Sequence, residues 1–147
     1  MRYPPRLGHL ATRKVVVAKL LPTFAEAHQI DDEEAARRLD SALTGRLLEE
    51  LLAATWNEMV NSKGKKRTDE QLLEKVALTL RDRPQRPGRL AASNPAWSAF
   101  LVLADLEAGT APDSARTVLQ SEQGQKMAAE GLAEAGRHLA RELTRGP

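Results

Sequence analysis

The sequence predicts an all-α protein, on three observations. Apolar residues make up 41% of the chain but aromatic residues only 3%, so alanine and leucine must supply most of the core, and both favour helices over strands. Leucines at positions 39, 43, 47 and 51 recur at the spacing of one helix face. Residues 94–109 have both ends of a helix, with an Asn94-Pro95 start and a Gly109 stop. We expect a single domain over residues 1–147, a compact bundle of about five or six helices around the central apolar helix at about 95–108.

The N-terminal half should contain two main helices. The first begins near His9 or Thr12 and runs to Leu21, where Pro22 should kink or end it because proline lacks the amide hydrogen and clashes with the preceding turn. The second should extend over residues 31–61 as one long strut with an acidic first turn. Gly45 lies inside it. The sequence allows either a break or a close helix contact at Gly45, and we predict a continuous helix.

The C-terminal half should contain the remaining helices. Thr68 and Gln71 form a capping box that starts a helix of about three turns. An irregular Pro/Arg-rich connection follows at about 83–93 and leads to the apolar helix. Beyond it, a short helix should face Ala115, Val118 and Leu119 inward.

The last helix should begin at Ser121 and carry an apolar stripe from Met127 to Leu143. Glycines at 124, 131 and 136 each cost roughly 1 kcal/mol of helix propensity relative to alanine. We therefore predict close helix contacts at these three positions.

Composition excludes several function classes. The chain has no cysteine, so it has no disulfide, thiolate metal site or cysteine nucleophile. No apolar run approaches the roughly 20 residues of a membrane span, and the N-terminus lacks the pattern of a signal peptide. The formal net charge is only +2. We expect a cytoplasmic protein without membrane contact.

Catalytic and metal-binding patterns are not evident in the sequence. His138 is flanked at i−4 and i+4 by Glu134 and Glu142, but ordinary ion pairing on a solvent-facing helix is favoured over a metal or acid–base site. His9 and His28 have no carboxylate or histidine at a recognised ligand spacing. Phosphate loops and nucleophile elbows are also absent. We predict that the protein is not an enzyme and uses no cofactor or metal.

Two basic segments flank the helix that starts at Thr68. A helix of about a dozen residues is only about 18 Å long, so both segments could border one surface that binds phosphates or an acidic protein partner. No aromatic residue is interleaved with them, which argues against base stacking and leaves contact with the phosphate backbone. The candidate residues are Lys63, Lys65, Lys66, Arg67, Arg81, Arg83, Arg86 and Arg89.

The two tryptophans have two interpretations. Trp56 falls late in the predicted strut, and Trp97 falls early in the apolar helix. Large aromatic residues at such positions usually pack in the core. Either one would be a candidate hot spot for a protein partner if the fold leaves it exposed.

Part of the C-terminal third resembles a known group of proteins. Residues 96–109, the run Ala115 to Leu119, the pair Gly131-Leu132 and residues 136–139 look like a family of small paralogous helical proteins from myxobacteria whose function is uncharacterised. The resemblance implies a bacterial protein from an expanded family, which suits partner-specific binding. It supplies no catalytic residues.

These observations favour a non-enzymatic protein-binding module, such as an adaptor, a regulator or a toxin-neutralising immunity protein. The alternative is a helical nucleic-acid-binding subunit of a larger ribonucleoprotein complex that contacts the phosphate backbone.

Overall fold

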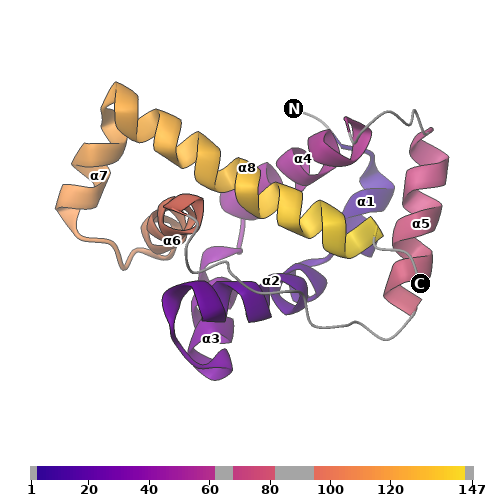
Figure 1. The fold of residues 1–147 in the computed structure, drawn as a ribbon, viewed down its shortest axis with the longest axis horizontal. Coiled ribbons are helices and arrows are strands. Elements are labelled where there is room, and N and C mark those ends of the chain that lie inside the picture. Colours follow the sequence, from indigo (N-terminus) through magenta and orange to yellow (C-terminus); the bar gives the residue numbers. More distant parts are fainter. Residues whose placement is uncertain (1–2, 62–67, 82–94, 145–147) are drawn as a thin grey trace.

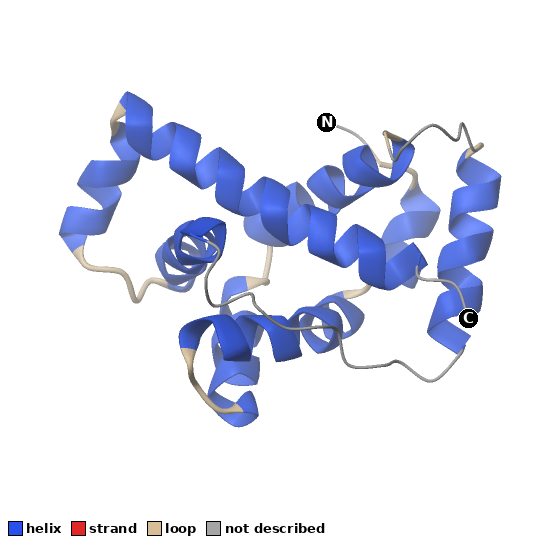
Figure 2. Cartoon of the chain, viewed as in Figure 1, coloured by secondary structure: helices blue, strands red, loops and turns tan. Residues whose placement is uncertain are grey.

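In the computed structural model, which describes residues 3–61, 68–81 and 95–144, every regular element is a helix (Figure 1, Figure 2). The all-α prediction is confirmed for these residues. Within them, none of the helices has both the length and the hydropathy of a membrane span. The helices are α1 (Pro5–Leu10), α2 (Arg13–His28), α3 (Asp32–Ala42), α4 (Arg46–Val60), α5 (Asp69–Arg81), α6 (Pro95–Ala108), α7 (Asp113–Gln120) and α8 (Glu122–Thr144).

The longest helix, α8, crosses the molecule and connects its parts (Figure 1). It contacts α2, α4, α5, α6 and α7. Its C-terminal half is the buried half, where Ala135, Leu139 and Leu143 are fully enclosed. Their three-to-four spacing places them on one face of the helix. The amphipathic period of α8 therefore organises the core.

The apolar helix α6 is less enclosed than its composition predicts. It buries Trp97, Phe100 and Ala104, whereas residues 101–103 are only half-buried. Because α6 is apolar on all sides, its composition selects no single face for burial. Within the described residues, α6 packs mainly along α8 and α3, with smaller contacts to α2, α4 and α7.

The predicted continuous helix over residues 31–61 is wrong. The chain leaves helical geometry between Ala42 and Arg46, which separates α3 from α4. Because of this break, α3 packs on α2 and α6, whereas α4 packs on α8. The apolar faces of α3 and α4 are therefore buried against different helices. A Cβ at Gly45 would meet no atom within 4 Å, so close helix contact is not its role either.

Pro22 neither ends nor interrupts α2. The helix continues six residues beyond it, to His28, and ends where Gln29 adopts a left-handed conformation with φ 53°. Thr12 caps the start by accepting the Val15 amide at 3.5 Å. Of the two predicted outcomes at Pro22, a helix end is therefore wrong, because packing of Phe24 and its neighbours in the core continues the helix.

Three predicted helix boundaries are confirmed. Thr68 and Gln71 exchange the two bonds of a capping box, at 3.1 and 3.2 Å. Gly109 ends α6 with φ 79°. The Ser121 hydroxyl accepts the Gly124 amide at 3.0 Å and so starts α8.

The glycines of α8 mark close helix contacts, as predicted. A Cβ at Gly131 would lie 2.7 Å from the Phe100 nitrogen on α6, and a Cβ at Gly136 would lie 2.9 Å from the Ala54 Cβ on α4. A Cβ at Gly124 would clash with the Val118 carbonyl oxygen on α7. Each glycine thus sets the approach of a different helix.

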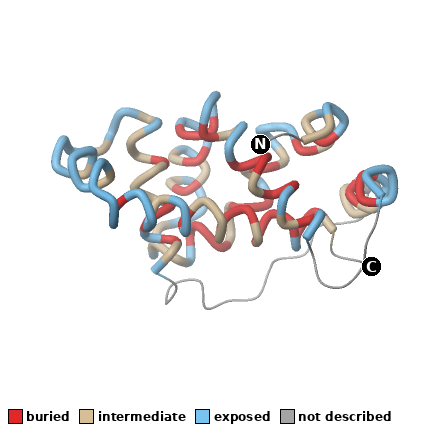
Figure 3. The backbone as a smooth tube through the Cα atoms, turned by 90° about the horizontal axis from the view of Figure 1, so that it is seen from above, coloured by how far each residue is buried: buried red, intermediate tan, exposed pale blue. Residues whose placement is uncertain are grey.

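The helix α7 does not face inward as predicted. It buries none of its side chains, and Val118 is 54% exposed. Met127, early in the predicted stripe of α8, is 45% exposed. The end of the molecule formed by α7 and the first turns of α8 is therefore largely exposed (Figure 1, Figure 3).

Candidate functional site

The basic surface predicted from the sequence falls almost entirely outside the described residues. Helix α5, which the two basic segments flank, packs on α8 and α1. Arg81 is its last residue, but the described structure does not include its side chain. The phosphate or acidic-partner site therefore stays a prediction. Its members outside the described residues are Lys63, Lys65, Lys66, Arg67, Arg83, Arg86 and Arg89.

Both tryptophans lie in the core, which is one of the two interpretations given above. Trp56 is 6% exposed and Trp97 is 2% exposed. The Trp97 ring packs edge-on against Phe100 and His138, with ring centroids 5.9 and 5.8 Å apart. In this chain, neither tryptophan offers a surface for a partner.

His138 is buried rather than solvent-facing, so the predicted exposed ion-pair face is wrong. It is 5% exposed, and its Nε2 lies 3.2 Å from the Thr23 hydroxyl of α2. Glu142 is also buried, whereas Glu134 binds Arg137. The described residues contain no group of three His, Asp or Glu side chains that could hold a metal ion.

A surface hollow of about 450 Å³ lies between α6 and α8 in the described part of the chain, and we call it the α6–α8 groove. Gly131 brings α6 and α8 together beneath it, because the Cβ of Ala99 would lie only 2.9 Å from a Cβ at this position. Its lining combines small apolar residues with three charged ones: Pro95, Ala96, Ala99, Met127, Glu130, Glu134 and Arg137.

Two of the charged residues that line the α6–α8 groove belong to an ionic cluster. Arg137 donates to Glu134 at 2.8 Å and lies 4.0 Å from Glu58 of α4. Glu134 is only 15% exposed at its side chain, so this pair is held more firmly than a fully solvated one. The groove is therefore lined by small apolar residues, an exposed Met127 and a charged cluster.

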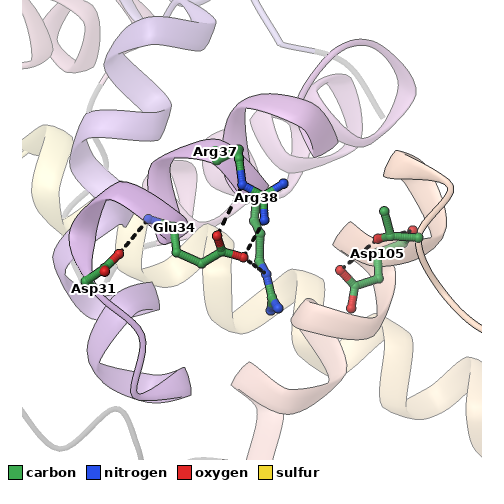
Figure 4. Close-up of polar contacts among 6 residues, drawn as sticks. Asp31, Glu34, Arg37, Arg38 and Asp105 are labelled. Carbon is green, nitrogen blue, oxygen red and sulfur yellow. Dashed lines mark hydrogen bonds and ion pairs between the residues drawn. The ribbon is translucent and has the colours of Figure 1, made fainter.

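A second, smaller hollow of about 210 Å³ lies between α3 and α6, and we call it the α3–α6 pocket. It is mainly polar, and its charged side chains come from both helices (Figure 4). The lining residues are Arg37, Arg38, Ser41, Asp105, Ala108 and Thr110.

Glu34 positions the arginines on the α3 side of this pocket. It accepts from Arg37 Nε at 3.1 Å and from Arg38 Nε at 3.0 Å, and the hydrogen bond from Arg37 is the main cause that lowers the pKa of Glu34 (Figure 4). The Asp31 carboxylate accepts the Glu34 amide at 2.8 Å and caps α3. Two arginines and one carboxylate leave this side with one net positive charge.

Asp105 forms the α6 side of the pocket. Its carboxylate accepts the Thr110 hydroxyl at 3.2 Å, and its carbonyl accepts the Thr110 amide at 2.8 Å. The described ion pairs do not include one between Asp105 and Arg38, although the two side chains come from helices that face each other (Figure 4). Opposite charges therefore line the pocket without neutralising each other by contact.

His28, the last residue of α2, is influenced by charges on both sides of the α3–α6 pocket. Burial, followed by the positive charge of Arg38, lowers the pKa of its imidazole, while Asp105 and a hydrogen bond with the Trp97 backbone act in the opposite direction. Its ring packs edge-on against Phe24 at 4.7 Å. Its Nε2 is buried and has no hydrogen-bond partner within the described parts of the chain.

Sequence reasoning missed both hollows. The i, i+3 and i, i+4 spacing of Glu34 with Arg37 and Arg38 does predict their pairing. However, nothing local in the sequence indicates that Asp105, more than sixty residues later, faces Arg38. Comparisons with protein-family models, with curated proteins and with solved structures find no match to this chain.

Proposed function

We propose that this protein is a non-enzymatic binding module, an adaptor, regulator or immunity-type protein, that holds a protein partner in the α6–α8 groove. The observation that carries the proposal is the combination of apolar and charged lining residues in one hollow of about 450 Å³. Protein interfaces likewise combine apolar residues that exclude water with polar and charged ones.

The exposed end of the molecule extends this surface. Met127 lines the groove and is 45% exposed, and Val118 of α7 is 54% exposed. Methionine is flexible and polarisable and adapts to partners of different shape. The charged lining residues are Glu130, Glu134 and Arg137, with one net negative charge, which favours a partner segment with an apolar anchor next to a basic side chain.

Site-specific crosslinking would identify the partner. The chain has no cysteine, so Met127→Cys carries the only thiol for a photoactivatable crosslinker. Leu78→Cys is the matched control, because Leu78 is 49% exposed but lies on α5. In extracts of the source cells, the proposal predicts a protein that crosslinks from position 127 and not from position 78.

The purified partner then provides a quantitative test. Met127→Glu replaces an apolar lining residue of the groove with a charged one and should raise the dissociation constant at least about tenfold, measured by calorimetry. Leu78→Glu should change it less than about threefold. Equal crosslinking from both positions, or an affinity that Met127→Glu leaves unchanged, would contradict the proposal.

The nucleic-acid alternative has its own outcome in this experiment. Its candidate cations lie in segments outside the described residues, so no described contact favours it. If the purified protein binds RNA or DNA at low salt, with an affinity that falls steeply as the salt concentration rises, the nucleic-acid alternative would be favoured over the protein partner.

A further inference from the structure

The α3–α6 pocket has a charge arrangement that selects its occupant. Its α3 side carries Arg37, Arg38 and Glu34, with one net positive charge, and its α6 side carries Asp105, with one negative charge. The pocket is therefore neutral overall but strongly dipolar.

The main binding groups on the two sides are available. Within the described residues, Glu34 engages Arg38 through Nε, which leaves the terminal amino groups of the guanidinium for a ligand. One Asp105 oxygen accepts the Thr110 hydroxyl, and carboxylate oxygens can each accept further bonds. Ser41 and Thr110 add hydroxyl groups to the lining.

This arrangement disfavours simple ions. A phosphate on Arg38 would be repelled by Asp105, and a metal cation on Asp105 would be repelled by the positive α3 side. A ligand that carries a positive and a negative group within a few ångströms of each other satisfies both sides.

The size of the pocket limits the ligand further. Its volume of about 210 Å³ is below the roughly 300 Å³ at which pockets for drug-sized ligands begin. We propose that the α3–α6 pocket binds a small zwitterion, a free α-amino acid, with its carboxylate on Arg38 and its ammonium group on Asp105.

Amide chemical shifts of the ¹⁵N-labelled protein test the proposal directly. The probes are the proteinogenic α-amino acids, added one at a time at millimolar concentration, followed by the amine and the carboxylic acid that match the best binder. At least one amino acid should produce saturable shifts at Ser41, Asp105 and Thr110. The matching amine and acid should bind at least about tenfold more weakly, because each loses one charged hydrogen-bonded contact.

Two charge-removing variants add a second criterion. Arg38→Gln and Asp105→Asn should each weaken binding at least about tenfold, and the amide introduced by Asp105→Asn keeps an oxygen that can accept the Thr110 hydroxyl. The matched control is Arg46→Gln, which removes an arginine from a similar i, i+4 pair with Glu50 on α4. If a variant unfolds, the comparison of the amino acid with its matching amine and acid on the native protein still tests the proposal.

Three results would overturn the proposal. One is the absence of saturable shifts at these amides with every α-amino acid. Another is equal binding of the singly charged analogues, and the third is a loss in Arg46→Gln as large as that in Arg38→Gln. Because the pocket shares no lining residue with the α6–α8 groove, these results are independent of the partner experiment.

Discussion

The two halves of α8 share one amphipathic pattern but have opposite surroundings. In the C-terminal half, Leu139 and Leu143 are fully buried, and Gly136 allows α4 to approach. In the N-terminal half, Met127 is 45% exposed beside α7, which buries none of its own side chains. An apolar stripe therefore shows which face of a helix favours burial, but not whether the same chain covers it. The uncovered half is where a partner is expected.

The largest predicted effect comes from truncating one apolar side chain in each half of α8. Leu139→Ala should lower the free energy of unfolding by about 2–5 kcal/mol, because it opens a cavity at a fully buried site. Met127→Ala should change it by less than about 0.5 kcal/mol, because the side chain is already half in solvent. Urea denaturation of both variants measures the difference. Similar losses in the two variants would show that the two halves are equally covered.

A smaller effect comes from the glycines. Gly131→Ala should lower the free energy of unfolding by about 2 kcal/mol, because the new Cβ would clash with backbone atoms of Phe100 and Ala96. The gain in helix propensity, roughly 1 kcal/mol, offsets only part of this cost. Gly124→Ala clashes with the Val118 carbonyl but should mainly displace α7. Hydrogen exchange should then rise in α7 while the denaturation midpoint stays nearly constant. A large global loss in Gly124→Ala would mean that α7 belongs to the cooperative core.

The sequence predicted the features that depend on local chemistry. The capping box at Thr68 and the glycine stop at Gly109 were predictable because a few neighbouring residues determine them. The break before Arg46 was not, because the leucine spacing continues across it and only the positions of α6 and α8 favour the interruption. The glycine pattern of α8 predicted close contacts but not which helices make them.

The candidate sites were harder to predict, for the same reason. The Glu34–Arg38 pair follows from helical spacing, whereas its position opposite Asp105 depends on how α3 docks on α6. The burial of His138 likewise depends on Thr23, which is 115 residues away in the chain. Long-range docking of this kind leaves no periodic signal in one sequence.

The smallest predicted effect uses pH to compare the same two regions. His28 belongs to the covered part of the molecule, whereas residues 111–130 contain no histidine. Burial lowers the pKa of folded His28 below its ordinary value of 6.5. As the pH falls through 6.5, the unfolded chain therefore binds a proton that folded His28 does not, and unfolding becomes more favourable. This stability is fully present above pH 6.5 and is lost progressively below it, by a modest amount because solvent partly screens a half-buried ring.

Urea denaturation between about pH 7 and about pH 5 measures this effect. The native protein should lose stability as the pH falls, and His28→Gln should give a shallower slope because the titrating ring is gone. His9→Gln, at an exposed position on α1, is the matched control. A slope in His28→Gln as steep as in the native protein would show that His28 is not excluded from protonation in the fold. Residues 111–130, which contain no histidine, should show no pH-dependent change in amide-exchange protection after correction for the intrinsic pH dependence of exchange. That result would confirm that the loss of stability at low pH arises in the covered part of the molecule.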